Sequence, residues 1–304
     1  MKQAIIDIGS NSIRLTVYDT DTVPFKILFK EKVMAGLASY VIDGMLSDEG
    51  IECAYNGLLD FMYTLESLNI ENVNLFATAS LRNINNTEKA IEIIKAATGY
   101  TVEIIGGETE ALFGYIGAIQ EVKLKDGAFM DIGGASTEIV SFRNAQPIQS
   151  VSFPVGSLNL YRQCVKKILP GEGSLKRIQS VISEKIDNDE LFKFDKSSPI
   201  VCVGGTSRAV LKLARKQFSL PSNCNSLSAN QLHTLCDVLC KGDKIASDLI
   251  LKMEPERIHT IIPGLMIMCH IFNRFDADEI IVSNYGVREG YLCQRILNVS
   301  CVWK

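Results

Sequence analysis

The chain has 304 residues, and 47% of them are hydrophobic, which is enough to bury a sizeable core and is typical of two domains. Its 31 basic and 35 acidic residues give a net charge of −4, which argues against general nucleic-acid binding. No apolar run reaches about 18 residues, so the sequence predicts no membrane-spanning helix.

The N-terminus and the cysteines indicate a cytoplasmic protein. Met1 is followed almost directly by a β-forming segment, which leaves no room for a signal peptide. Nine cysteines are spread through apolar segments without a Cys-x-x-Cys pair. Cys236 and Cys240 lie one helical turn apart with His233 nearby. This spacing leaves a zinc site open as an alternative to buried, reduced thiols.

The first strongly patterned stretch covers residues 4–18, where an apolar strand leads into a tight turn and then into a second strand. Asp7 stands just before the turn, and Gly9 allows the backbone to approach a bound anion closely. Successive N–H groups of such a turn can form a concave phosphate site. The candidate phosphate-binding residues are Gly9, Ser10, Asn11 and Ser12.

From residue 25 to residue 105, strands and helices alternate. The predicted strands cover residues 25–33, 73–78 and 101–105. Ser47 and Thr87 are the predicted N-caps of two helices between these strands. This alternation predicts a mixed α/β sheet. Arg82 falls just beyond the carboxyl end of a strand, where such sheets bind ligands.

The next helix begins at Gly106 and Gly107 and carries Glu110 in its first turn. A carboxylate there matches the helix dipole, and such a residue is often only a solvated one. This helix, however, connects the first hairpin's half of the chain to a second copy of the same hairpin. That position favours a functional carboxylate at Glu110.

Residues 128–136 repeat residues 4–12 without gaps, with Asp131 in the place of Asp7. A single Asp-x-Gly turn could be an ordinary hairpin, but two copies predict duplicated halves that face each other across a polyphosphate. Asp131 and Glu138 flank the second turn and offer carboxylates suited to Mg²⁺. A Walker A loop would instead lead into a helix and contain Gly-Lys-Ser/Thr. The candidate phosphate-binding residues of this turn are Gly133, Gly134, Ala135 and Ser136.

The second half of the chain also alternates predicted helices and strands. Ser157 is predicted to begin a helix that ends at Pro170, and residues 174–186 form another helix. Residues 199–203 form a buried strand that leads into the start of a further helix. A phosphate, a ribose or a base edge could bind at that helix start. Its candidate residues are Gly204, Gly205 and Thr206.

Four cationic residues share one face of the helix that follows this turn. They are Arg208, Lys212, Arg215 and Lys216. Two readings stay open: a solvated surface, or a track for a long polyanion. Further along, residues 261–272 predict a buried helix, and residues 280–282 a last buried strand.

The two hairpins, the Gly-Gly-Thr turn and three further short motifs resemble the exopolyphosphatase and guanosine pentaphosphate phosphohydrolase family, within the superfamily of actin, Hsp70 and sugar kinases. The resemblance covers nearly the whole chain. Its motifs lie at residues 7–12, 78–82, 107–111, 131–138, 204–206 and 285–290. It implies an α/β fold of two duplicated actin-like (ribonuclease H-like) domains with the active site in the interdomain cleft. We expect domains at residues 1–123 and 124–304, with the last helix able to pack back on the first.

The resemblance also implies roles for matching residues. Glu110 matches a catalytic glutamate that activates water, and Arg82 matches an arginine that holds phosphate. Asp131 and Glu138 match residues of the metal site, to which we add Asp7 from the first hairpin. The expected cofactor is Mg²⁺ or Mn²⁺. Positioning, charge neutralisation and an oriented nucleophile are what phosphoryl transfer requires.

Three features depart from the family pattern. Ala135 replaces the third glycine usual in the second loop. His259 stands where many relatives carry aspartate, and we interpret it as a supporting or structural residue. The given sequence also ends soon after residue 292, so we expect it to resemble the short, two-domain members and not the longer relatives that carry a C-terminal helical domain.

The sequence therefore predicts metal-dependent release of terminal orthophosphate from inorganic polyphosphate. The alternatives are removal of the 5′-terminal phosphate of guanosine pentaphosphate, a kinase, and a non-catalytic sensor that binds polyphosphate or an alarmone. The expected partners are polyphosphate or guanosine pentaphosphate, with no nucleic acid and no membrane. A homodimer stays open.

Overall fold

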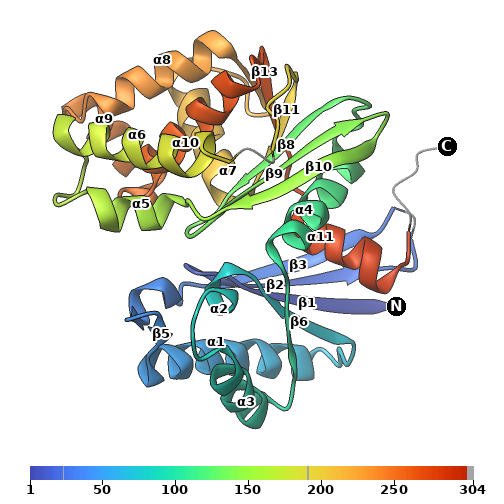
Figure 1. Ribbon diagram of the computed structural model, residues 1–304. Helices are drawn as coiled ribbons and strands as arrows, with labels where there is room; N and C mark the ends of the chain where they lie inside the picture. The colour runs from blue at the N-terminus through green and yellow to red at the C-terminus, as the bar shows by residue number, and fades with distance from the viewer. Residues whose placement is uncertain (23, 190–191, 300–304) are drawn as a thin grey trace. The chain divides into compact units, whose positions relative to one another are not determined.

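The computed structural model describes residues 1–22, 24–189 and 192–299 (Figure 1). The chain divides into two compact units, Met1–Thr109 and Glu110–Lys304. This division falls inside helix α4 (Gly107–Glu121), whereas the sequence placed a boundary in the loop after that helix. Each unit has its own sheet and its own hydrophobic core, so the predicted α/β architecture is confirmed.

The first unit is built on a five-stranded sheet in the order β3-β2-β1-β6-β7. Its strands are β1 (Lys2–Ile8), β2 (Ile13–Asp19), β3 (Lys26–Val33), β6 (Val73–Ala77) and β7 (Val102–Ile104). Strand β2 runs antiparallel to both β1 and β3, whereas β6 and β7 run parallel to β1. The carboxyl ends of β1, β6 and β7 therefore meet at one edge, which is where ligands bind in open α/β sheets.

Two helices, α1 (Asp48–Ser67) and α3 (Thr87–Thr98), cover one face of this sheet (Figure 1). Ser47 caps α1 as predicted, since its side chain accepts from the amide of Gly50 at 3.2 Å. The apolar positions of both helices pack on alternate residues of the strands, among them Ile6 and Ile8 of β1. Short elements complete the unit: η1 (Leu37–Tyr40), β4 (Val41–Ile42), β5 (Met45–Leu46) and α2 (Ala79–Arg82).

The second unit repeats the plan with a six-stranded sheet in the order β10-β9-β8-β11-β13-β12. Its strands are β8 (Gly127–Ile132), β9 (Thr137–Arg143), β10 (Gln146–Phe153), β11 (Ile200–Val203), β12 (Ser226–Ser228) and β13 (Glu279–Val282). An antiparallel hairpin, β8-β9, again stands beside a parallel strand, here β11. The duplication predicted from the repeated hairpin sequence is thus present in the topology.

The remaining helices belong to the second unit (Figure 1). They are α4, α5 (Ser157–Cys164), α6 (Glu172–Asp187), α7 (Gly204–Gln217), α8 (Ala229–Cys240), α9 (Lys244–Met253), α10 (Ile261–Arg274) and α11 (Val287–Tyr291), with the short helices η2 (Pro255–Arg257) and η3 (Leu292–Ile296). Met130 and Ile132 of β8 point into the main core, whereas Phe129 points to the other face and contacts α4 at Gly114.

One helix is shorter than the sequence predicted. The helix that begins at Ser157 was expected to end at Pro170, but α5 ends at Cys164. Val165 is extended, and the Arg177 guanidinium binds the Cys164 carbonyl at 2.8 Å. A helix-terminal carbonyl without an intrahelical partner is thereby satisfied.

Within the described parts of the chain, no helix is both long enough and apolar enough to cross a membrane.

Candidate active site

The first hairpin joins β1 to β2 through a turn closed by a bond from the Gly9 amide to the Ser12 carbonyl at 3.1 Å. The carbonyls of Ser10 and Asn11 accept from backbone amides of the η1 region, each at 2.9 Å. In a trans peptide the N–H points opposite to the C=O. The amides that follow these two carbonyls therefore point away from the protein segment that holds the loop, as a phosphate-binding turn requires.

The second hairpin has the same construction. The Gly133 amide donates to the Ser136 carbonyl at 2.9 Å. The Gly134 carbonyl accepts from two amides at the start of α5, those of Leu158 and Asn159, each at 3.0 Å. The Ala135 amide, in the same peptide plane as that carbonyl, consequently points away from α5.

The methyl group of Ala135 is compatible with this close packing. The tight approach between loop and α5 occurs at Gly156, where a β-carbon would overlap the backbone of Gly134 and Ala135. Ser157 adds two bonds to the Gly133 carbonyl, from its amide at 3.0 Å and from its hydroxyl at 3.1 Å. The loop is therefore fixed from outside, and a third glycine is not needed for it to form.

The two hairpins differ in charge at one matching position. In the first, Asp7 lies directly opposite Arg14, whose Nε also donates to Ser12 Oγ at 3.1 Å. In the second, Asp131 lies directly opposite Glu138. Opposed residues of an antiparallel pair have neighbouring side chains on one face. The first hairpin thus pairs a carboxylate with a cation, and the second pairs two carboxylates.

Glu138 is almost fully enclosed, at 2% exposure. Burial, and then the negative charges of Glu110 and Asp131, raise the pKa of its carboxyl well above the usual range. Hydroxyl groups of Ser136 and Ser152 act in the opposite direction, and Ser152 Oγ donates to Glu138 Oε1 at 2.7 Å. Three carboxylates are therefore brought close enough in the second unit to repel one another.

A divalent cation fits the chemistry of this cluster. Glu110 at 8% exposure and Glu138 at 2% are unusually buried acids, and buried carboxylates need compensation by positive charge. Carboxylate and hydroxyl oxygens are the ligands that Mg²⁺ and Mn²⁺ prefer. In the described chain, however, no group of three His, Cys, Asp or Glu side chains is already arranged to hold a metal ion. The assignment of Asp131, Glu138 and Asp7 as metal ligands stays a prediction.

The Gly-Gly-Thr turn lies beside the same cluster. A β-carbon on Gly204 would overlap Oδ1 of Asp131, and one on Gly205 would overlap the guanidinium of Arg257. Thr206 Oγ1 donates to the Ile132 carbonyl at 2.9 Å, which ties the start of α7 to the end of β8. The space above both glycines is thus occupied by side chains of this protein.

Arginines gather around this turn. Besides Arg257 from η2, Arg208 from α7 is partly buried here. Burial, and then the charge of Arg288, lower the pKa of Arg208, while Asp131 raises it. The sequence did not single out Arg257 or Arg288 as site residues. No local sequence pattern joins these two arginines to Asp131, because they come from segments far apart in the chain.

The cationic face predicted on α7 is not a row of free charges. Lys212 Nζ forms an ion pair with Glu254 Oε1 at 2.7 Å. Arg215 donates to the Cys224 carbonyl, with Nε at 2.8 Å. Lys216 is exposed. The structure therefore favours a surface held by local partners over a polyanion track.

In the first unit, Arg82 ends α2 at the carboxyl edge of the sheet. Its Nη1 donates to the Ile105 carbonyl at 2.8 Å, just before α4 begins. Ser80 of the same short helix donates its hydroxyl to the Ile8 carbonyl, next to Gly9. Arg82 and the first glycine turn therefore share one sheet edge. The predicted position of Arg82, just beyond the carboxyl end of its strand, is confirmed.

Two further sequence candidates have structural explanations. Cys236 Sγ and Cys240 Sγ lie 3.8 Å apart, and their hydrogen bond and burial raise the pKa of Cys240. His233 Nε2 is 2.9 Å from Asn273 Oδ1 instead. These contacts favour buried thiols over the zinc alternative. His259 packs against the Tyr161 ring with centroids 4.7 Å apart, which agrees with a structural role.

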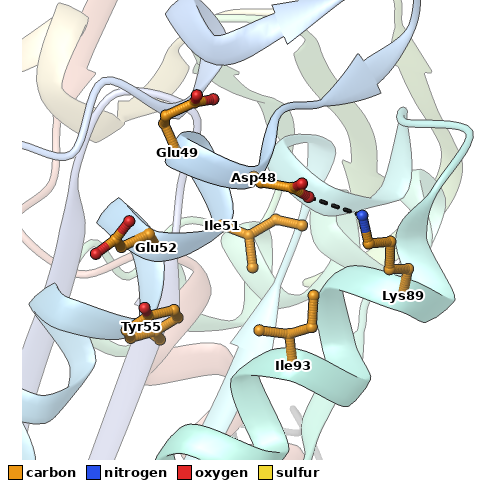
Figure 2. Close-up of a pocket in the computed structure, with 7 residues that line it drawn as sticks. All are labelled: Asp48, Glu49, Ile51, Glu52, Tyr55, Lys89 and Ile93. Carbon is orange, nitrogen blue, oxygen red and sulfur yellow. Dashed lines mark hydrogen bonds and ion pairs between the residues drawn. The ribbon is translucent and has the colours of Figure 1, made fainter.

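A separate surface pocket of about 390 Å³ lies between α1 and α3 in the first unit (Figure 2). It is lined by Asp48, Glu49, Ile51, Glu52, Tyr55, Lys89 and Ile93. Lys89 spans its rim through an ion pair with Asp48 at 2.7 Å. None of these lining residues belongs to the predicted site.

Comparison with known proteins shows which proteins are similar to this chain. The profile of the Ppx/GppA phosphatase family matches residues 16–299. Exopolyphosphatase 1 of Mycobacterium tuberculosis is 20% identical over 97% of this chain and 88% of its own length. The guanosine-5′-triphosphate,3′-diphosphate pyrophosphatase of Pseudoalteromonas atlantica is 26% identical over 98% of this chain, which spans only 59% of that longer protein. The crystal structure of the Aquifex aeolicus member of the Ppx/GppA family superposes with a TM-score of 0.79, at 26% identity and 98% coverage of both chains.

Proposed function

Because the chain belongs to the Ppx/GppA phosphatase family, we propose that it is a metal-dependent hydrolase that releases terminal orthophosphate from inorganic polyphosphate. One observation carries the proposal. Three carboxylates, from α4, β8 and β9, gather beside a glycine turn whose carbonyls are turned onto α5. Negative charge concentrated next to a phosphate-binding turn requires a cation, and polyphosphate hydrolysis uses one.

In this proposal Glu110 is the general base. It stands in the first turn of α4 and is largely buried, so its carboxylate is poorly hydrated. Glu110 would orient the attacking water and accept its proton. Phosphoryl transfer requires such a residue to position the nucleophile.

Asp131 and Glu138 would hold Mg²⁺ or Mn²⁺, which when bound neutralises phosphate charge. Ser136 and Ser152 orient the Glu138 carboxylate through their hydroxyls. Asp7 is a weaker candidate, because Arg14 opposes it across the strands. We assign it the role of positioning Arg14 and the first turn.

The phosphate groups would be held by backbone amides of the two turns and by arginine. Arg82 supplies a planar, bidentate donor that lysine cannot replace. Arg257 and Arg208, beside the Gly204 turn, add positive charge on the side of Asp131. We also propose a cytoplasmic location, supported by the free thiols of the described cysteines.

The deciding experiment measures orthophosphate release from long polyphosphate, short polyphosphate and guanosine pentaphosphate, each with Mg²⁺, Mn²⁺ or EDTA. We expect metal-dependent release from polyphosphate that EDTA abolishes. Preferred turnover of guanosine pentaphosphate would assign the activity named for the Pseudoalteromonas relative. Binding without release from any substrate would contradict the enzyme proposal and favour a sensor. Nucleotide consumption only with a small acceptor would indicate a kinase.

A further inference from the structure

Helix α4 carries four residues on one face that the proposed mechanism does not fully use. Glu110, Gly114, Gly117 and Glu121 follow the spacing i, i+4, i+7 and i+11, which places all four on one side of an α-helix. Glu110 stands at the first turn and Glu121 is the last residue of the helix. The two carboxylates are thus connected by a rigid rod of about three turns.

The two glycines between them let other segments of the second unit approach the helix backbone. A β-carbon on Gly114 would overlap the ring of Phe129 from β8. One on Gly117 would overlap the carbonyl of Gly286, just before α11. Gly290 in turn abuts the Phe113 carbonyl, so that α11 lies across α4 (Figure 1). Such close backbone contacts leave little freedom to slide or rotate.

Glu121 binds the segment that leads into α11. Its Oε2 accepts from Ser283 Oγ at 2.7 Å and from the Asn284 amide at 2.6 Å, and its Oε1 accepts from Asn284 Nδ2 at 3.1 Å. Partial burial raises the pKa of this carboxyl, but the bonds from Ser283, Asn284 and Tyr285 outweigh that effect and lower it. Glu121 is therefore held as a carboxylate with several donors, although it lies at the surface.

The same segment is bonded to the strand end next to Asp131. The Ser283 amide donates to the Cys202 carbonyl of β11 at 2.9 Å. A β-carbon on Gly286 would lie 3.4 Å from Val203, the residue directly before Gly204. Asp131 packs on Gly204. A continuous series of contacts thus leads from Glu121, through residues 283–286, to the strand end that supports Asp131.

We propose that Glu121 is a positioning residue for the reaction: by binding Ser283 and Asn284 it fixes α4 against the end of β11, and so sets the place of Glu110 relative to Asp131. This inference rests on the proposed function, in which Glu110 is the base. Displacing a catalytic group by about 1 Å can cost up to roughly 100-fold in rate. Loss of an anchor three turns away would act through such a shift, without removing any group that touches the substrate.

The test compares Glu121→Ala, Glu121→Gln and Ser283→Ala with the matched control Glu172→Gln, whose exposed carboxylate pairs with Lys176 at 2.7 Å on α6. For Glu121→Ala we expect kcat for polyphosphate to fall by about 10- to 100-fold with KM within about twofold. Glu121→Gln keeps one acceptor oxygen and should recover part of the loss. Ser283→Ala keeps the Asn284 bonds and should lose less than Glu121→Ala. Glu172→Gln should match the wild type.

A double variant separates positioning from general stabilisation. If Glu121 acts through Glu110, then adding Glu121→Ala to Glu110→Gln should cost less than about twofold further, because effects on one catalytic unit are not additive. A merely structural role would lower the melting temperature while folded Glu121→Ala kept normal kcat, and that result would overturn the proposal.

Hydrogen exchange tests, independently of activity, whether Glu121 holds residues 283–291 and α4 in place. In Glu121→Ala, or in Ser283→Ala should the first variant not fold, amides of residues 283–291 and of α4 should exchange about tenfold or more faster. Glu172→Gln should leave them unchanged. A wild-type protein that releases no phosphate would refute the proposed function while leaving this measurement valid. Unchanged exchange in both anchor variants would refute the positioning role.

Discussion

The carboxylate of Asp131 lies directly against the α-carbon of Gly204, at a point where any β-carbon would overlap Oδ1. The neighbouring Gly205 makes room for the Arg257 guanidinium in the same way. A Gly-Gly pair at a helix start commonly lets the backbone approach a phosphate. Here the pair also lets two charged side chains of the protein itself, those of Asp131 and Arg257, reach the N-terminus of α7. The turn therefore shapes the site through the side chains it accommodates.

Replacing Gly204 should consequently disable the enzyme. Gly204 has φ +82°, a left-handed conformation that alanine adopts only with strain, and a methyl group would displace the Asp131 carboxylate. We expect Gly204→Ala to lower kcat by about 100-fold and to raise the metal concentration needed for half-maximal rate. Gly173→Ala on α6, where a β-carbon meets nothing within 4 Å, is the control and should retain full activity. Normal metal dependence in Gly204→Ala would contradict this explanation.

Glu110→Gln should remove the general base while keeping the shape of the side chain. We expect orthophosphate release to fall by about 10²- to 10⁴-fold, the contribution typical of general acid–base catalysis. Substrate binding, measured by calorimetry at constant metal concentration, should persist, because a neutral amide repels phosphate less than a carboxylate does. A variant with near wild-type turnover would end the assignment of Glu110 as the base.

Asp131 and Asp7 should differ in their effect on the Mg²⁺ requirement, because their cross-strand partners have opposite charge. Asp131 faces Glu138, whereas Asp7 faces Arg14. Asp131→Asn should therefore increase the Mg²⁺ concentration for half-maximal activity by at least about tenfold, because it removes a negative ligand from a carboxylate pair. Asp7→Asn should change the Mg²⁺ requirement much less. Equal shifts in both variants would show that Asp7 is a ligand of comparable weight.

The hairpins and their duplication could be predicted because their signals are local. A strand, a glycine turn and a strand are encoded within about fifteen residues, and the repetition strengthens the inference. The ungapped alignment also places Arg14 on Glu138, so the charge difference was present in the sequence. It becomes informative only when the antiparallel register shows that these residues face Asp7 and Asp131.

The supporting residues could not be found in the same way. Ser152 lies on β10, a strand of mixed polar and apolar residues that gave no clear alternation in the sequence. Arg257 and Glu121 reach their partners through contacts between segments distant in sequence. The early end of α5 likewise depends on Arg177, a residue of another helix. Tertiary contacts of this kind leave no periodic pattern for local reasoning to detect.

Stability without metal should depend on pH through Glu138. Burial, Glu110 and Asp131 raise its folded pKa above the usual 4.5. The contribution of such a group is fully present below its unfolded pKa and is lost as pH rises through the folded pKa. The metal-free protein should therefore have a lower melting temperature at pH 8 than at pH 5, and Glu138→Gln should reduce this difference. Added Mg²⁺ should raise the melting temperature more at pH 8, because metal and proton compete for the same carboxylates. A metal-free melting temperature independent of pH in this range would contradict the role assigned to Glu138.

The cationic face of α7 should add little to the affinity for long polyphosphate. Lys212 is paired with Glu254, and Arg215 is bound to the Cys224 carbonyl, so removing either charge does not remove a free anion site. We expect Lys212→Ala combined with Lys216→Ala to change KM for long polyphosphate by less than about twofold, with an unchanged dependence on ionic strength. Arg208 is different, because it is partly buried and the charge of Asp131 raises its pKa. Arg208→Met should therefore impair short and long polyphosphate by similar factors. The measurement is KM against chain length at two salt concentrations. A rise in KM confined to long chains in the Lys212/Lys216 double variant would restore the polyanion track and show that the ion pair with Glu254 opens when substrate binds.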